Sequence, residues 1–194
     1  HTESVGHLLK NPGNIGKILT DTFIPAHLIT VESIKFELSN ESYHCHVEND
    51  EAVISMDAIK SQIENISGST PVALIIRTLP NNDAKKSMRF TSSPPTFFTN
   101  ESLQYISQLG VQHLIVDLPS IDRMSDDGIL GNHRIFWGDG INPKGDVNQD
   151  SKKTITELAY IPNSVEDGFY FMNIQIPHFD CDAAPSRPLL CKIL

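Results

Sequence analysis

The amino-acid sequence predicts an α/β fold in which helices flank a mixed sheet. Residues 72–79 and 111–119 are nearly continuous apolar runs, as is typical of strands that are buried on both faces. Residues 55–66 and 99–109 carry apolar side chains at helical spacing, and one such segment precedes each run. Helices and strands that alternate at these lengths indicate right-handed βαβ crossover units.

Signals at both ends support the two predicted helices. We expect Ser55 and Thr99 to be N-caps, because a side-chain oxygen there can accept a hydrogen bond from the first helical turn. Gly68 and Gly110 follow the last apolar positions, and glycine readily adopts the left-handed conformation that ends a helix. A shorter helix is predicted at residues 15–19.

Most of the other predicted elements are strands. They share branched or alternating apolar residues, and they comprise residues 26–32, 33–38, 168–179 and the apolar segment 189–194. Residues 153–159 are predicted as a short helix. Residues 123–154 are rich in Gly, Asp and Asn, interrupted by His133-Arg-Ile-Phe-Trp137. They are predicted as a long loop, which at this length is usually functional or mobile.

Length and composition indicate one domain over residues 1–194, because 39% of its residues are hydrophobic and suffice for a sizeable core. The net charge of −9 argues against nucleic acid and anionic membranes as partners. No apolar run approaches the length of a membrane span. The three cysteines form no C-x-x-C pair, which indicates reduced thiols and leads us to expect a cytoplasmic protein. Since the chain opens on a histidine, we expect further residues upstream in the native protein.

The first seven residues are the strongest candidate for chemistry. If this segment is extended, His1, Glu3, Val5 and His7 share one face. The imidazole nitrogens of the two histidines and the carboxylate of Glu3 suit Zn²⁺ or Mn²⁺. The alternative is a terminal segment whose histidines are solvated. The sequence has no G-x-S-x-G elbow, no Walker loop and no cysteine in a nucleophile context, so metal-assisted chemistry is favoured.

Other histidines offer weaker candidates. His44 and His46 would share one face of a strand and could form a second metal site, although no zinc-finger partner follows at the required spacing. The alternative is a pair of exposed histidines. Three more are expected to be structural: His27, His113 and His178. Phe136 and Trp137 could line an apolar substrate pocket or belong to the core.

Six further segments follow the first in a specific order. They are Leu74-Ile-Ile-Arg-Thr78, Phe98-Thr-Asn-Glu-Ser-Leu103, Asp117-Leu-Pro-Ser-Ile-Asp122, Asn132-His-Arg134, Thr156-Glu-Leu158 and Asp182-Ala-Ala-Pro-Ser-Arg187. Together with His1, Glu3 and His7 they resemble the cyclase family of metal-dependent hydrolases, which includes kynurenine formamidase and isatin hydrolase. The family pattern H-x-G-T-H-x-D-x-P-x-H is matched from its second histidine onwards, with Glu3 in place of the aspartate and Val5 in place of the proline.

The resemblance implies a swivelling β/β/α architecture and a homodimer. It also implies a hydrolase of the arylformamidase kind, which cleaves a C–N bond in a small amide, formamide or lactam. His1, Glu3, His133 and Glu157 would hold one or two divalent ions, Zn or Mn, with Glu166 as an alternative to Glu157. Such a metal lowers the pKa of bound water from about 15.7 to about 7, and the resulting hydroxide attacks the carbonyl.

The resemblance assigns His7 as the general acid/base, since a histidine can accept and return a proton near neutral pH. We expect Arg77, Asp122 and Arg187 to form structural ion pairs or hydrogen bonds. The rival to the enzyme is a non-catalytic relative that binds a metal or a small molecule.

Overall fold

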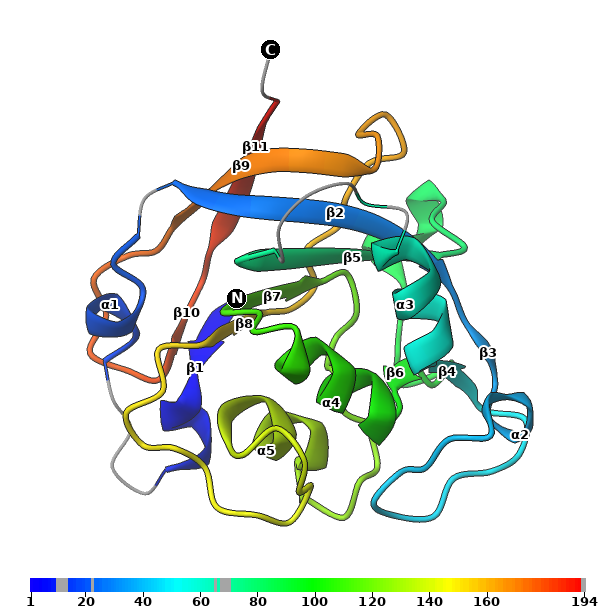
Figure 1. The fold of residues 1–194 in the computed structure, drawn as a ribbon. Coiled ribbons are helices and arrows are strands. Elements are labelled where there is room, and N and C mark those ends of the chain that lie inside the picture. The colour runs from blue at the N-terminus through cyan, green and yellow to red at the C-terminus, as the bar shows by residue number, and fades with distance from the viewer. Residues whose placement is uncertain (10–13, 22, 65, 67–70, 193–194) are drawn as a thin grey trace.

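The computed structural model describes residues 1–9, 14–21, 23–64, 66 and 71–192 (Figure 1). Within these ranges an eight-stranded mixed sheet has the order β10-β1-β8-β7-β5-β2-β9-β11. Its strands are β1 (Thr2–Ser4), β2 (Ile24–Glu32), β5 (Ala73–Leu79), β7 (His113–Val116), β8 (Thr154–Thr156), β9 (Gly168–Gln175), β10 (Ala183–Ala184) and β11 (Arg187–Lys192). A smaller sheet contains β3 (Ile34–Lys35), β4 (Ala52–Ile54) and β6 (Phe97–Phe98).

Short helices complete the described part of the chain. They are α1 (Ile15–Ile18), α2 (Phe36–Ser39), α3 (Met56–Ile63), α4 (Asn100–Gln108), α5 (Gly131–Trp137) and two 3₁₀ helices, Val5–Leu8 and Asp83–Ser87. Figure 1 shows α3, α4 and α5 together on one side of the sheet. No helix among the described residues has the length and apolar character that crossing a membrane would require.

The predicted α/β architecture with a mixed sheet is confirmed. Strands β2, β5, β7 and β8 pair parallel with one another, whereas the pairs β1–β8, β1–β10, β2–β9 and β9–β11 are antiparallel. Helix α3 lies in the crossover from β2 to β5, and α4 lies in the crossover from β5 to β7. β10 and β11 are consecutive in the chain yet stand at opposite ends of the strand order, so the sheet curls until its two ends approach each other.

The two faces of the central strands pack into separate cores. Leu74 and Ile76 of β5 point towards the helices, where Ile59 of α3 and Leu103 of α4 meet them. Ile75 points to the opposite face and packs in a second cluster with residues of β2, β7 and β9. This alternation follows from the two-residue period of a strand, and it explains why both strands are apolar throughout.

The predicted N-caps are confirmed. Ser55 accepts a hydrogen bond from the backbone N–H of Ala58, and Thr99 accepts one from the backbone N–H of Ser102. Gly110 follows α4 with φ +77°, the left-handed conformation that glycine tolerates best. The predicted end of α3 at Gly68 lies outside the described residues.

Three predictions of secondary structure were wrong. Residues 153–159 form strand β8 rather than a helix, because the branched residues of 154–156 fill the gap between β7 and β1. Residues 33–38 contain only two strand residues before α2 begins. The predicted loop at 123–154 contains α5, whose N-cap residue Leu130 makes no side-chain capping bond. Its first N–H groups bond instead to the distant carboxylate of Asp122.

Candidate metal centre

The first seven residues are extended only as far as Ser4. β1 pairs with β8 on one side and β10 on the other, and a 3₁₀ helix begins at Val5, which is buried in the core. The condition under which His1, Glu3, Val5 and His7 would share one strand face is therefore met only for His1 and Glu3. The turn nevertheless brings His7 back beside Glu3, so that His7 Nδ1 lies 3.7 Å from Glu3 Oε2.

Glu3 lies at the centre of a cluster that gathers all four residues implied as metal ligands. Its Oε1 is 2.8 Å from Nε2 of His133, and its Oε2 is 3.6 Å from Nε2 of His1. Glu157 completes the group, with Oε1 3.7 Å from His133 Nε2 and Oε2 3.7 Å from His1 Nε2. Ligand atoms of His1, Glu3 and Glu157 lie within 4.8 Å of one another, which is close enough for a single ion to bridge them.

The fold explains how such distant residues meet. Glu3 is in β1, and Glu157 directly follows the neighbouring strand β8. His133 lies in the first turn of α5, which packs against the same region of the core. Glu157 is held in place because its Oε1 accepts a hydrogen bond from the backbone N–H of Ile121 at 3.1 Å.

The pKa values of the two buried glutamates are shifted in opposite directions. Burial alone would raise the pKa of Glu3, but the neighbouring His1 and His133 lower it to about 2. Burial raises the pKa of Glu157 to about 7, and the nearby charge of Glu3 acts in the same direction. Burial opposes the charged form of His133, yet hydrogen bonds to Asp122 and Glu3 raise its pKa well above 6.5. In the metal-free chain His133 is therefore an imidazolium between two carboxylates.

Asp122 is the group that orients His133. Its Oδ2 accepts hydrogen bonds from His133 Nδ1 at 2.7 Å and from the His133 backbone N–H at 3.2 Å. Its Oδ1 accepts from the Asn132 backbone N–H and from the Tyr43 hydroxyl. A carboxylate that holds the Nδ1 proton leaves Nε2 facing the cluster, which is the arrangement behind many metal-bound histidines.

The donor set fits a divalent transition metal. Two imidazole nitrogens and two carboxylates converge, and such mixed N/O sites suit Zn²⁺ and Mn²⁺. Glu3 is 1% exposed and Glu157 is 5% exposed, so a cation between them would offset the cost of holding two buried carboxylates together.

Solved structures of other proteins share this fold. A potential metal-dependent hydrolase with cyclase activity matches with a TM-score of 0.63 and 18% sequence identity, over 98% of this chain and 76% of the other. A predicted metal-dependent hydrolase from Bacillus stearothermophilus matches with a TM-score of 0.55 and 17% identity, over 98% and 74%. An isatin hydrolase bound to the product analogue thioisatinate matches with a TM-score of 0.53 and 10% identity, over 97% and 69%.

The likeness extends over nearly the whole chain and shows a common fold. No protein-family profile and no curated protein matches the sequence.

Phe136 and Trp137 occupy the core and offer no surface to a substrate. They are 0% and 1% exposed and pack with the helices and the sheet. The Trp137 indole N–H donates to the Lys153 carbonyl, and its ring lies 5.3 Å from the ring of His133. Of the two roles that the sequence left open, the burial of both side chains favours the core, where α5 turns this face inwards beside His133.

His44 and His46, considered as a second metal site, do not lie together in the structure. His46 is exposed beside Glu48, whereas the side chain of His44 is 0% exposed. His44 Nε2 lies 3.7 Å from Asp126 Oδ2 and 4.0 Å from Asp122 Oδ1, and these three groups form a second candidate cluster.

Hydrogen bonds argue against a metal in that second cluster. The Asn132 amide nitrogen donates to two backbone carbonyls, so its oxygen must accept from Asn100. The same Asn100 nitrogen faces His44 Nδ1 at 3.1 Å, which makes Nδ1 an acceptor and places the proton of neutral His44 on Nε2. Nε2 then has no lone pair to offer an ion.

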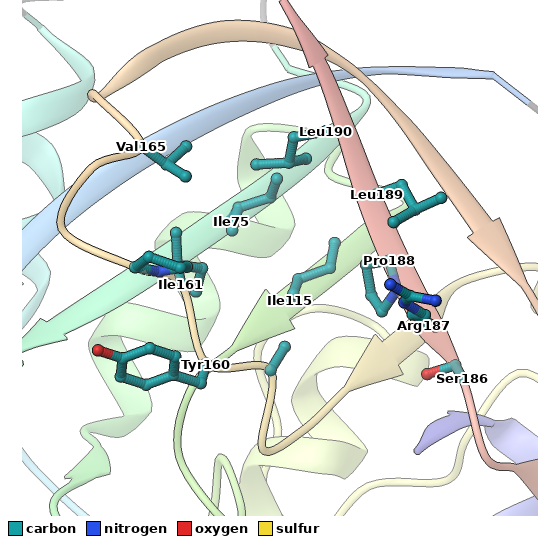
Figure 2. Close-up of a pocket in the computed structure, with 12 residues that line it drawn as sticks. Ile75, Ile115, Tyr160, Ile161, Val165, Ser186, Arg187, Pro188, Leu189 and Leu190 are labelled. Atoms are coloured by element: carbon teal, nitrogen blue, oxygen red, sulfur yellow. The ribbon is translucent and has the colours of Figure 1, made fainter. Parts of the chain in front are cut away.

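A separate cavity of about 380 Å³ lies on the opposite face of the sheet (Figure 2). It lies between β11, the central strands and the segment 159–165, and its lining is mostly apolar, with Ile75, Ile115 and Leu190 among its residues. None of the candidate ligands lines it. The cavity is therefore distinct from the candidate metal centre.

The sequence did not indicate which side chains orient His133 and His7. Asp122 was expected to be structural, and the structure adds that its partner is His133. Asp182 Oδ2 lies 2.9 Å from His7 Nδ1, a pairing across 175 residues that no local spacing could show. The only signal was that both aspartates stand in segments that resemble family motifs.

Proposed function

We propose that this chain is a metal-dependent hydrolase that cleaves a C–N bond in a small amide, formamide or lactam. The observation that carries the proposal is His133, which is held by Asp122 and aimed at Glu3, with His1 and Glu157 around the same space. The shared fold adds support, since proteins of that fold are named as metal-dependent hydrolases and one as an isatin hydrolase.

His1, Glu3, His133 and Glu157 would hold the metal, with Zn²⁺ or Mn²⁺ as the ion. When bound, such an ion supplies Lewis-acid chemistry, because it lowers the pKa of water and polarises a carbonyl oxygen. Burial holds the pKa of Glu157 at about 7, so its carboxyl group is partly protonated near neutral pH in the metal-free chain. Binding of a metal would favour the carboxylate and release that proton.

His7 would carry the proton. Its side chain is 41% exposed, so a substrate can reach it, and its Nδ1 lies 3.7 Å from the candidate ligand Glu3. A histidine at that place can take a proton from water and return it to the leaving nitrogen of the substrate.

Metal analysis and a hydrolysis assay test the proposal. The purified protein should retain Zn²⁺ or Mn²⁺ and should hydrolyse N-formylkynurenine or isatin. His7→Ala should keep the metal and lose about 10²–10⁴-fold in kcat, the usual contribution of a general acid/base. His46→Ala is the matched control, because this exposed histidine lies beside Glu48, outside the centre, and should change neither quantity.

Two outcomes would separate the alternatives. Protein that holds no transition metal and cleaves neither compound would end the hydrolase proposal. Protein that holds the metal without cleaving these or related amides would favour the rival, a non-catalytic binding relative. A homodimer and a cytoplasmic location stay predictions; light scattering on the purified protein measures the first.

A further inference from the structure

We propose that Asp182 is a positioning residue that keeps neutral His7 in the tautomer with its proton on Nδ1. The role in catalysis rests on the proposed function, whereas the tautomer itself does not. Asp182 Oδ2 is 2.9 Å from His7 Nδ1, within hydrogen-bond distance. A carboxylate can only accept, so in this pair Nδ1 donates and Nε2 keeps its lone pair.

The backbone fixes Asp182 in this place independently of its side chain. The Asp182 carbonyl accepts two hydrogen bonds from Ser4, one from the backbone N–H and one from the hydroxyl, each at 3.0 Å. Immediately after it, Ala183 and Ala184 pair with Glu3 and Thr2 of β1. The same strand pairing that carries the candidate ligand Glu3 therefore holds the carboxylate that faces His7.

The direction of this hydrogen bond has a chemical consequence. In water a neutral imidazole carries its proton more often on Nε2, so the Nδ1 tautomer needs an acceptor to stabilise it. Glu3 Oε2 is the other carboxylate oxygen near Nδ1, at 3.7 Å, and it belongs to the candidate metal centre. Asp182 is the nearer acceptor, and with it in place His7 Nε2 is ready to accept a proton.

Asp182 also adds a residue from the far end of the described chain to the site. Its side chain is 31% exposed, so it lies beside His7 at the surface of the centre and not in the core. A change at Asp182 should therefore alter the behaviour of His7 without removing buried packing.

Imidazole nitrogen NMR tests the tautomer directly. In metal-free protein, at a pH where His7 is neutral, the proton should be found on Nδ1. Asp182→Leu should move it to Nε2. Asp182→Asn should retain Nδ1–H in part, because an amide oxygen still accepts a hydrogen bond. Asp180→Leu is the matched control: it makes the same change two residues away, where the carboxylate bonds to Asn14.

The kinetic expectation separates positioning from folding. Asp182→Leu should lower kcat by on the order of 10–100-fold, the usual effect of losing the group behind a working histidine, with KM nearly unchanged. Asp180→Leu should lower neither. A wild-type His7 protonated on Nε2, or an Asp182→Leu variant with unchanged tautomer, overturns the inference. If the wild type proves inactive, the proposed function fails while the tautomer measurement still decides the role of Asp182. If Asp182→Leu does not fold, Asp182→Ala removes the same acceptor with a smaller side chain, and it too should move the proton to Nε2.

Discussion

Replacing Asp122 with asparagine tests whether the candidate metal centre depends on the carboxylate behind His133. Asp122 is 1% exposed, and its two oxygens accept four hydrogen bonds, two of them from His133. An asparagine keeps one oxygen and turns the other position into an NH₂ donor that faces N–H or O–H groups. At least one oxygen's bonds are therefore lost, and the negative charge opposite the imidazolium disappears.

Two magnitudes follow for Asp122→Asn. Removing one partner of a buried ion pair costs about 3–5 kcal/mol, so the free energy of unfolding of the metal-free chain should fall by that order. Removing the group that orients a metal-bound histidine costs about 10–100-fold in metal affinity, or about 1.4–2.7 kcal/mol. Urea unfolding in the presence of a chelator measures the first quantity, and titration of Zn²⁺ against a chelating dye measures the second.

Asp117→Asn is the matched control. Asp117 is also buried, but it accepts its hydrogen bonds from Thr78 of β5 and from Lys85, and neither residue belongs to the candidate metal centre. Its loss should reduce stability and leave metal affinity unchanged. If Asp122→Asn bound Zn²⁺ as tightly as the wild type, or if Asp117→Asn weakened it equally, the orienting role of Asp122 would be refuted.

Two further predictions concern pH and packing. In the metal-free chain, stability should be greatest near about pH 5. Stability should fall at higher pH, because the raised pKa values of Glu157 and His133 mean that the folded state holds protons which the unfolded chain releases. Stability should also fall towards pH 2, because Glu3, whose pKa is lowered in the folded state, then becomes protonated. Urea unfolding between pH 3 and 9 checks this, and a flat profile would contradict it. Gly131→Ala should cost about 1–3 kcal/mol, because its methyl group would overlap the His44 ring; unchanged urea unfolding would show that the ring can move.

The sequence predicted the elements whose signals are local. Strands β5 and β7 are apolar on both faces, and α3 and α4 carry their own caps, so each pattern specifies its element without reference to the rest of the chain. Strand β8 was missed because three residues, Thr154 to Thr156, become a strand only through pairing with β7 and β1. Tertiary context of this kind overrides weak local propensity.

The site shows the same division. His1, Glu3 and His7 could be proposed from their spacing, and His133 and Glu157 from the order of motifs. The groups that orient them could not, because Asp122 reaches His133 across a loop and Asp182 reaches His7 from the far end of the chain. α5 was hidden for a related reason: its N-terminus is capped by Asp122 and not by a neighbouring residue. The Asp122 carboxylate thus both caps α5 and orients His133.

Glu3 is the point at which the centre departs from the resembled pattern, and its surroundings explain how a glutamate can serve there. One oxygen reaches His133 Nε2 at 2.8 Å, while the other faces both His1 and His7. A single carboxylate therefore lies within 4 Å of three imidazoles. In the metal-free chain the positive charge of His133 balances this carboxylate. An incoming divalent ion has to displace the Nε2 proton, which bonds to Glu3, while the Nδ1 proton stays with Asp122. Metal affinity should therefore rise with pH through neutrality, as Glu157 and His133 release their protons, whether the bound ion then serves catalysis or binding alone.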